Sequence, residues 1–348
     1  MRQPTATLLL LLLSAITVFA QEVPAIAKHE RWVTALAFAS QGDLLATVGG
    51  ESLQFRPGDV KLWNYKTGAL AASLEQGHPT NVWSAAWSPD ASTLVTTGYD
   101  GKVVVWNVAE KKPRATLTNH KSWCRAVAFT PDGKHFATGG EDGTVIVWEA
   151  GGPKDLKTFK AHESAVYSLT FSPDGTTLAT SSIDKLAKLW DWNAGTEKAK
   201  LEGHADAVWT VKFSADGQKI ATAGADRKIK IWDAAGKEQF QLEGHKDWIS
   251  GVAFHPNNAM LASASHDRSV KLWDLNEKKE SANLGPYKSS VWSVAFSPDG
   301  AVLATGAHKD GVRLWNLADK TELFPHPAAE DKKPAEAKPA EAKPEEKK

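Results

Sequence analysis

The chain has 348 residues, of which 42% are hydrophobic, and its 41 basic residues balance its 41 acidic residues, so the formal net charge is zero at pH 7. A chain of this length can bury a large core, and its one cysteine, Cys124, excludes a disulfide within the chain. Balanced charge excludes the broad basic surface that attracts a phosphate backbone, so we expect no nucleic acid partner.

The first twenty residues have the pattern of an export signal. Arg2 precedes an apolar run at residues 8–18 that is too short to span a bilayer comfortably. Val18 and Ala20 fit the small-residue rule of a cleavage site. We therefore expect residues 1–20 to be a signal peptide that is cleaved after Ala20; the alternative is an uncleaved anchor. The mature protein is then exported, to the periplasm or outside the cell, and has no membrane span.

Similar units follow one another at intervals of 41 to 43 residues, and each contains a strand-like run that ends in tryptophan. In the run at residues 224–233, Ile229 and Ile231 alternate with polar residues, which predicts a half-buried strand. Turns such as Ser-Pro-Asp-Gly at residues 172–175 separate other runs, because proline presets φ and Asp-Gly supplies a side-chain hydrogen bond and a positive φ. Each unit thus predicts four short strands, and such units bury their apolar faces when they pack radially. The tryptophans are Trp63, Trp106, Trp148, Trp190, Trp232, Trp273 and Trp315.

The Gly-His and Trp-Asp pairs of these units, as in Gly203-His204 and Trp232-Asp233, resemble those of the WD-repeat family. The resemblance extends over about residues 22–324 in seven copies. It implies an all-β fold, a seven-bladed β-propeller of four-stranded antiparallel blades over residues 21–324. We expect residues 22–27 to form an N-terminal strand that closes the last blade, because this pairing covers an exposed strand edge. The alternative is that residues 321–324 take that place.

The last segment, residues 325–348, consists mainly of Pro, Ala, Glu and Lys. A segment with almost no apolar side chains cannot offset the entropy of ordering, so we expect a disordered tail. The alternative is a tether to envelope polymers or to a partner.

Five units carry a histidine, a hydroxyl, an aspartate and a tryptophan at matching positions. A hydroxyl, an imidazole and a carboxylate could form a catalytic triad, but an active site does not need five copies in one chain. In the WD-repeat family this quartet is a hydrogen-bonded structural network, in which the donor-only indole N–H finds an acceptor. We therefore expect structural tetrads, no catalytic residue and no enzyme. The tetrads are His78, Thr96, Asp100, Trp106; His120, Thr138, Asp142, Trp148; His162, Thr180, Asp184, Trp190; His204, Thr222, Asp226, Trp232; and His245, Ser263, Asp267, Trp273.

Two units depart from this pattern. The first has an insertion at residues 51–56, and the seventh has Tyr287 in the place of the histidine and an aspartate, Asp310, one position late. We expect both networks to be incomplete, and the seam between these two blades to be the softest part of the fold.

Every unit has an aromatic residue three or five positions after the histidine position. By resemblance, both positions lie on the top face of the propeller, around its central channel. Large, rigid and amphipathic side chains are typical of a recognition surface; the alternative is that they only pack between blades. The insertion is expected to add Phe55 and Arg56 to this face. The aromatic residues are Trp32, Trp123 and Trp248 at the third position and Trp83, Tyr167, Trp209 and Trp292 at the fifth.

The predicted function is a monomeric protein-interaction scaffold that binds an unidentified protein on its top face. The rivals are a propeller enzyme acting in the channel mouth, which needs a non-repeating polar cluster, and a glycan-binding module that uses the aromatic residues. No cofactor or metal is expected, because the chain has no Cys-x-x-Cys-His motif and no Gly-rich phosphate loop, and His266 and His308 alone make a poor zinc site. Cys124 occupies a position where other units carry valine or isoleucine, so we expect it to be buried.

Overall fold

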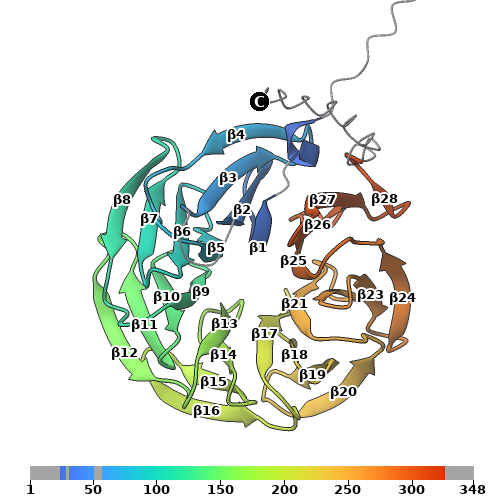
Figure 1. The fold of residues 1–348 in the computed structure, drawn as a ribbon. Helices are drawn as coiled ribbons and strands as arrows, with labels where there is room; N and C mark the ends of the chain where they lie inside the picture. Colours follow the sequence, from blue (N-terminus) through green and yellow to red (C-terminus); the bar gives the residue numbers. More distant parts are fainter. Residues whose placement is uncertain (1–23, 29–30, 51–56, 326–348) are drawn as a thin grey trace, which may run out of the picture.

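The structure is a computed structural model that describes residues 24–28, 31–50 and 57–325. Over these residues the chain forms seven four-stranded antiparallel sheets arranged around a central axis, as the blades of a propeller (Figure 1). The predicted seven-bladed, all-β fold is confirmed. The predicted signal peptide, the tail beyond Pro325, and Phe55 and Arg56 of the insertion lie outside the described residues.

The four strands of each blade follow one another in the chain, from the innermost strand at the axis to the outermost (Figure 1). Blades one to four are β1 (Trp32–Phe38), β2 (Leu44–Gly50), β3 (Asp59–Asn64), β4 (Ala69–Ser73); β5 (Val82–Trp87), β6 (Thr93–Gly98), β7 (Val103–Asn107), β8 (Lys112–Leu117); β9 (Cys124–Phe129), β10 (His135–Gly140), β11 (Thr144–Glu149), β12 (Asp155–Lys160); and β13 (Val166–Phe171), β14 (Leu178–Ser182), β15 (Ala187–Asp191), β16 (Thr196–Leu201). Blades five to seven are β17 (Val208–Phe213), β18 (Lys219–Gly224), β19 (Lys228–Asp233), β20 (Glu238–Glu243); β21 (Ile249–Phe254), β22 (Met260–Ser265), β23 (Val270–Asp274), β24 (Lys279–Leu284); and β25 (Val291–Phe296), β26 (Val302–Ala307), β27 (Gly311–Asn316), β28 (Thr321–Glu322). A short 3-10 helix, η1 (Ala25–Lys28), precedes blade one.

The hydrophobic core lies between neighbouring blades. Between blades four and five, for example, Leu189 and Leu201 pack in one cluster with Val208, Ile220 and Trp232. Because both faces of a blade are covered in this way, the middle strands are buried almost throughout. Only the outermost strands have largely exposed residues, as in β20.

The alternation of apolar and polar residues in β19 predicts a strand with one side facing solvent. In the structure both sides of β19 are covered by neighbouring blades. Lys230, on the side predicted to face solvent, is buried, at 6% exposure. Its ammonium donates a hydrogen bond to Glu238 Oε2 at 2.7 Å and lies next to Gly203 in the loop before blade five. A buried lysine is tolerated here because its charge is paired and its long stem adds apolar contact.

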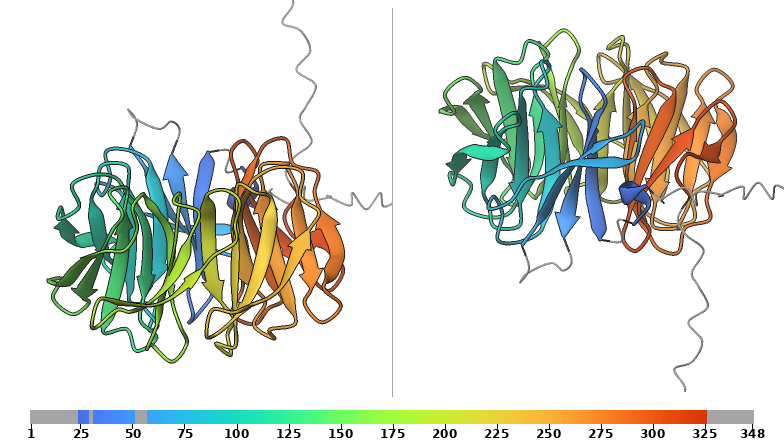
Figure 2. Two further views of the ribbon diagram at one scale, coloured as in Figure 1. Left: turned by 90° about the horizontal axis from the view of Figure 1, so that it is seen from below. Right: turned by 90° about the horizontal axis from the view of Figure 1, so that it is seen from above.

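The predicted Ser-Pro-Asp-Gly turns end the innermost strands. After β13, Ser172 Oγ donates to Asp174 and accepts a hydrogen bond from the N–H of Thr177 at 3.0 Å. Gly175 has a φ of 74°, a conformation that glycine adopts without strain. The turns lie at the opposite end of the innermost strands from the histidine loops, so the starts of these strands all open onto one face of the ring. Figure 2 shows the two loop-bearing faces edge-on.

The ring does not close through an N-terminal strand, and this prediction is wrong. The fourth strand of blade seven is β28, which pairs with Trp315 and Asn316 of β27. The reason is local: Asp319 accepts hydrogen bonds from the N–H and the hydroxyl of Thr321, at 3.0 and 2.7 Å, in the turn that leads β27 directly into β28. The chain that follows β27 therefore takes the outer edge, as the alternative assignment had it.

The N-terminal segment closes the ring by packing instead. It forms η1, which contacts β4 of the first blade and β27 of the last (Figure 1). Ile26 is 1% exposed and lies in a cluster with Trp63 and Leu314, which come from these two blades. Its N–H donates to the carbonyl of Gly68 at 3.0 Å. Ile26 thus adds a buried contact between the two ends of the propeller, which also pack directly through Val33 and Leu36 of β1 and Ala304 and Val312 of blade seven.

Candidate functional site

Four blades join their predicted quartet by hydrogen bonds. In blade five, Trp232 Nε1 donates to Thr222 Oγ1 at 2.8 Å, and Thr222 Oγ1 lies 2.7 Å from His204 Nε2. His204 Nδ1 lies 2.8 Å from Asp226 Oδ2. Since the indole only donates, Thr222 accepts from it and gives its own proton to Nε2, so the ring proton sits on Nδ1 and faces the carboxylate. The same chain of bonds joins His78, Thr96, Asp100 and Trp106; His162, Thr180, Asp184 and Trp190; and His245, Ser263, Asp267 and Trp273.

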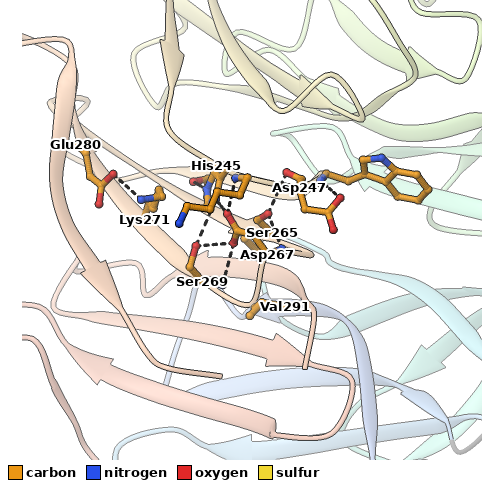
Figure 3. Close-up of polar contacts among 12 residues, drawn as sticks. His245, Asp247, Ser265, Asp267, Ser269, Lys271, Glu280 and Val291 are labelled. Atoms are coloured by element: carbon orange, nitrogen blue, oxygen red, sulfur yellow. Dashed lines mark hydrogen bonds and ion pairs between the residues drawn. The ribbon is translucent and has the colours of Figure 1, made fainter. Parts of the chain in front are cut away.

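The aspartate of blade six also holds the loop around its histidine (Figure 3). Asp267 Oδ2 accepts hydrogen bonds from His245 Nδ1 and from the N–H of Lys246, at 2.8 and 2.9 Å, while Oδ1 accepts from Ser269 Oγ at 2.6 Å. Burial by itself raises the pKa of Asp267, but the bonds from His245 and Ser269 outweigh it and hold the pKa well below its usual value. The ionised carboxylate therefore ties the histidine loop to the turn before β23.

The quartet of blade three lacks one link, which corrects the predicted tetrad. Thr138 Oγ1 still accepts from Trp148 Nε1 and meets His120 Nε2, both at 2.8 Å. His120 Nδ1, however, is buried without a hydrogen-bond partner among the described residues. Asp142 accepts instead from the N–H and hydroxyl of Thr144, at 3.0 and 2.6 Å. Burial lowers the pKa of His120 to about 4, so its ring is neutral at pH 7.

Blade seven builds a different network around a tyrosine. As expected, the chain of bonds from tryptophan to aspartate is incomplete, because no hydrogen bond joins Tyr287 to Asp310 among the described residues. Tyr287 OH accepts from Trp315 Nε1 at 2.9 Å and lies 2.8 Å from Thr305 Oγ1. Asp310 accepts from a guanidinium nitrogen of Arg313 at 2.7 Å, and that guanidinium lies over the Tyr287 ring. A phenol thus takes the place of the imidazole. In blade one, Thr47 accepts from Trp63 Nε1 at 2.9 Å while Asp59 pairs with Arg31, and His29 lies outside the described residues.

The quartets are closed to substrate. Thr222 is 0% exposed, and so is the side chain of His204. Thr180 with His162 and Ser263 with His245 are equally buried. A nucleophile must reach the reacting atom, and these hydroxyls are sealed inside a blade. The geometry therefore supports a structural role for the quartets.

The fifth position after the histidine lines the mouth of the central channel in all seven blades. Below this mouth the channel is lined by small side chains, such as Ser84, Ser168 and Ser293. Four of the predicted top-face aromatic residues therefore meet around one opening. Eight residues line the mouth, namely His266 and the seven fifth-position residues Thr34, Trp83, Arg125, Tyr167, Trp209, Ser250 and Trp292.

One side of the mouth is built on Arg125. Its guanidinium carbon lies 4.7 Å from the ring centre of Trp83, 5.1 Å from that of Trp123 and 4.4 Å from that of Tyr167. Tyr99 stacks on Trp123 with the ring centres 4.0 Å apart. Cation–π attraction holds these rings around the guanidinium. The charge of Arg125 is balanced by an ion pair with Glu141.

The ring contacts continue around the other side of the mouth. Tyr167 meets Trp209 edge-on with ring centres 4.5 Å apart, and Trp209 stacks with Trp248 at 5.6 Å. His266 lies 5.6 Å from Trp248 and 4.9 Å from Trp292. Trp32 stands apart and meets His308 edge-on. We call the continuous series the aromatic arc; it consists of Trp123, Tyr99, Trp83, Arg125, Tyr167, Trp209, Trp248, His266 and Trp292.

Three members of the aromatic arc were not among the predicted site residues, namely Tyr99, Arg125 and His266. Tyr99 and His266 each precede the aspartate of their blade's turn. The N–H of His266 donates to the carbonyl of Trp248 at 2.9 Å, and Tyr99 repeats this pairing in blade two. The residue before the aspartate therefore lies beside the third position after the histidine. Arg125 itself is the fifth-position residue of blade three, so the repeat spacing contained the signal for all three.

The top face combines exposed apolar surface with unpaired donors. Trp248 is 44% exposed, and Ile183, which precedes the aspartate of blade four, is 38% exposed. The indole nitrogens of Trp83 and Trp209 are buried without an acceptor among the described residues. Burial also lowers the pKa of His266, which is therefore neutral at pH 7. The large exposed apolar side chains of this face thus come from blades four and six.

The histidines of the top face contact tryptophans and are not grouped as ligands. Within residues 24–28, 31–50 and 57–325, no three His, Cys, Asp or Glu side chains are placed to hold a metal ion. The same residues contain no helix that is long and apolar enough to cross a bilayer.

The chain is similar to known β-propeller and WD-repeat proteins. Two family models match the chain: the IFT122 first beta-propeller over residues 166–332 and the echinoderm microtubule-associated protein second beta-propeller over residues 82–248. Similar curated proteins include the WD repeat-containing protein slp1 of Schizosaccharomyces pombe, 35% identical over 20% of this chain and 13% of its own length. These matches support the predicted resemblance of the chain to the WD-repeat β-propeller family.

Other relatives match the chain over similarly short stretches. Protein HIR1 of Phaeosphaeria nodorum is 30% identical over 31% of the chain and 10% of its own length. The WD repeat and SOCS box-containing protein 1 of Takifugu rubripes is 31% identical over 23% of the chain and 18% of its own length. The chain thus spans less than a fifth of each of these relatives, and the similarity concerns the repeats.

Proposed function

We propose that this propeller is an exported, non-catalytic and monomeric scaffold that binds a protein partner on its top face, across the aromatic arc. WD-repeat propellers are typically protein-interaction scaffolds. The observation that carries the proposal is the aromatic arc itself, an unbroken series of ring and guanidinium contacts that runs over six neighbouring blades around one opening.

The composition of the arc suits recognition of a protein. Tryptophan, tyrosine and arginine are the residues that most often dominate the binding energy of interfaces. Their contacts with one another hold them in place before a partner arrives, so little conformational entropy is lost on binding. Trp248, the most exposed member of the arc, offers its ring to the partner. The sealed quartets give no comparable support to the rival, an enzyme acting in the channel mouth.

The partner interface predicts a large loss of binding in Trp248→Ala. Truncation of such an anchor typically costs about 2 kcal/mol or more, which weakens binding by roughly thirtyfold. The partner is first captured from an envelope extract of the source cells and identified, and its affinity for each purified variant is then measured by calorimetry. Leu156→Ala is the matched control, because Leu156 is 49% exposed on the outer strand β12, away from the arc.

Unchanged affinity in Trp248→Ala, with a melting curve like that of the parent protein, would remove the arc from the interface. Binding of oligosaccharides that is lost in the same variant, with no protein partner captured, would favour the glycan-binding alternative.

Export is the second part of the proposal and is supported by the Ala20-Gln21 junction. Expression of the whole chain in the source cells is expected to give a mature protein in the envelope or the medium. Its intact mass is expected to correspond to a first residue at Gln21. A cytoplasmic protein that keeps Met1 would contradict export. That result would not bear on the proposed top-face interface.

A further inference from the structure

The channel below the aromatic arc contains one lysine. Lys212, on β17, lines the channel together with Ser84, Ser168 and Ser293. It occupies the eighth position after the histidine of its blade. The other blades carry small residues at this position, so blade five alone has a long side chain at the eighth position. The small residues are Ala37, Ala86, Ala128, Thr170, Ala253 and Ala295.

Lys212 has no counter-charge among the described residues. The channel lining contains two charged side chains, Arg125 and Lys212, and neither aspartate nor glutamate. Arg125 at the mouth is already paired with Glu141. Burial is the one cause that lowers the pKa of Lys212, and no carboxylate acts to raise it. A half-buried ammonium without a partner is costly, so an anionic guest in the channel is stabilised.

Apart from Arg125, the polar side chains around Lys212 are neutral hydroxyls and indole N–H groups, so none of them supplies a negative charge. The indole N–H groups of Trp83 and Trp209, at the mouth directly above, lack acceptors among the described residues. The hydroxyls of Thr34 and Ser250 already donate to backbone carbonyls, at 2.6 and 2.7 Å. A guest that brings a negative charge with acceptor oxygens therefore complements the Lys212 ammonium in charge and in hydrogen bonding.

The size of the channel limits the guest to a side chain or a chain end. The cavity that holds Lys212 has a volume of about 160 Å³, and the mouth above it about 90 Å³. Pockets for drug-sized ligands and cofactors begin at roughly 300 Å³. A nucleotide or a sugar chain is too large to reach Lys212, whereas a carboxylate on a short stem is not.

We propose that the channel binds a carboxylate of the partner, which enters between the rings of the aromatic arc and pairs with Lys212. The inference rests on the proposed top-face interface and gives the chemistry of its centre. The carboxylate belongs to an aspartate or glutamate side chain or to a chain terminus. The rings contact the stem and backbone of the guest, and the Lys212 ammonium supplies charge-assisted hydrogen bonds.

The test uses the whole mature protein with its lysines reductively dimethylated with ¹³C, so that the Lys212 signal is observed by NMR. Three probes are titrated: N-acetylglutamic acid α-amide, with a side-chain carboxylate; N-acetylalanine, with a terminal carboxylate; and N-acetylglutamine amide, which is neutral. We expect one or both carboxylates to shift the Lys212 signal with saturation below about 0.1 M, and the neutral probe to leave it in place. The carboxylate that saturates first identifies the source.

Lys212→Met and Lys246→Met separate the channel from the general charge of the top face. Lys246 is an exposed lysine that follows the blade-six histidine, so its loss removes the same charge outside the channel. The identified partner is expected to bind Lys212→Met at least about tenfold more weakly than the parent, and Lys246→Met within about twofold.

Shifts of the Lys212 signal that are equal for all three probes, or that rise linearly without saturation, overturn the inference. Partner binding that survives in Lys212→Met but is lost in Trp248→Ala overturns the proposal that Lys212 binds a carboxylate. The proposed top-face interface is then retained. Binding that survives in both variants overturns both. Melting curves of the variants exclude unfolding as the cause of any loss.

Discussion

Ile26→Ala is expected to lower the free energy of unfolding by about 2–4 kcal/mol. Ile26 is 1% exposed in the cluster that joins the first and last blades, with Trp63 and Leu314 as neighbours. Removal of its side chain loses buried apolar area and leaves a cavity at the place where the ring closes. Urea denaturation followed by tryptophan fluorescence measures the change.

Leu70→Ala is the matched control for this seam. Leu70 lies on β4, the strand of blade one that η1 contacts, and is 45% exposed. Its truncation is expected to change stability by no more than about 0.5 kcal/mol. Equal effects of the two substitutions would contradict closure through Ile26. A third variant that ends after Leu317 removes β28 and measures the outer strand separately.

Asp226→Ala is expected to lower the free energy of unfolding by about 1–3 kcal/mol, because it leaves a buried donor unsatisfied. The ring nitrogen of His204 that faces Asp226 is buried and has no other hydrogen-bond partner among the described residues. The carboxylate also accepts from the N–H groups of Ala205 and Lys228, at 3.2 and 3.1 Å, so its loss loosens the histidine loop. Partner binding below the melting transition is expected to persist, since the quartet lies inside the blade.

Asp142→Ala isolates the histidine bond. Asp142 holds its own turn through Thr144 but makes no hydrogen bond to His120. Asp226 accepts from His204 and from the N–H of Ala205, and Asp142 has neither bond among the described residues. Asp142→Ala is therefore expected to cost less than Asp226→Ala by roughly 1–2 kcal/mol. Equal losses in the two blades would show that the turn, and not the histidine, accounts for the effect. Loss of partner binding in Asp226→Ala at an unchanged melting temperature would assign the quartet a direct role in function.

The arrangement of the top face separates two tasks. The quartets stabilise each blade from inside, and the aromatic arc lies outside them on the rim of the channel. In blade six the two meet, because Asp267 bonds to His245 while its neighbour His266 packs between Trp248 and Trp292. A rigid turn therefore sets the position of a surface ring, which explains how a face built from loops keeps a defined shape.

The repeats made most of the fold predictable. Each unit repeats its own turn, strand and quartet residues, and these interactions are local: Thr222 and Trp232, for example, are ten residues apart and pair across adjacent strands. The period therefore indicated the number of blades, and the matching positions of histidine, hydroxyl, aspartate and tryptophan indicated the hydrogen bonds in blades two, four, five and six. The resemblance to WD repeats placed the aromatic residues of the fifth position on the top face around the channel, but Arg125 at the same position was not predicted.

The sequence by itself thus determined the β-propeller fold, the number of its blades and the aromatic positions around its axis. This was possible because a repeat encodes the contacts within one unit and between neighbouring units. Only the tertiary structure decided how the ring closes, where Ile26, which precedes the first set of strands, is buried between the first and last blades. It also decided that Asp142 makes no hydrogen bond to His120, and that Arg125 gathers three rings around one guanidinium. These features do not recur from repeat to repeat. They depend on which side chains neighbouring blades present to each other in the closed ring.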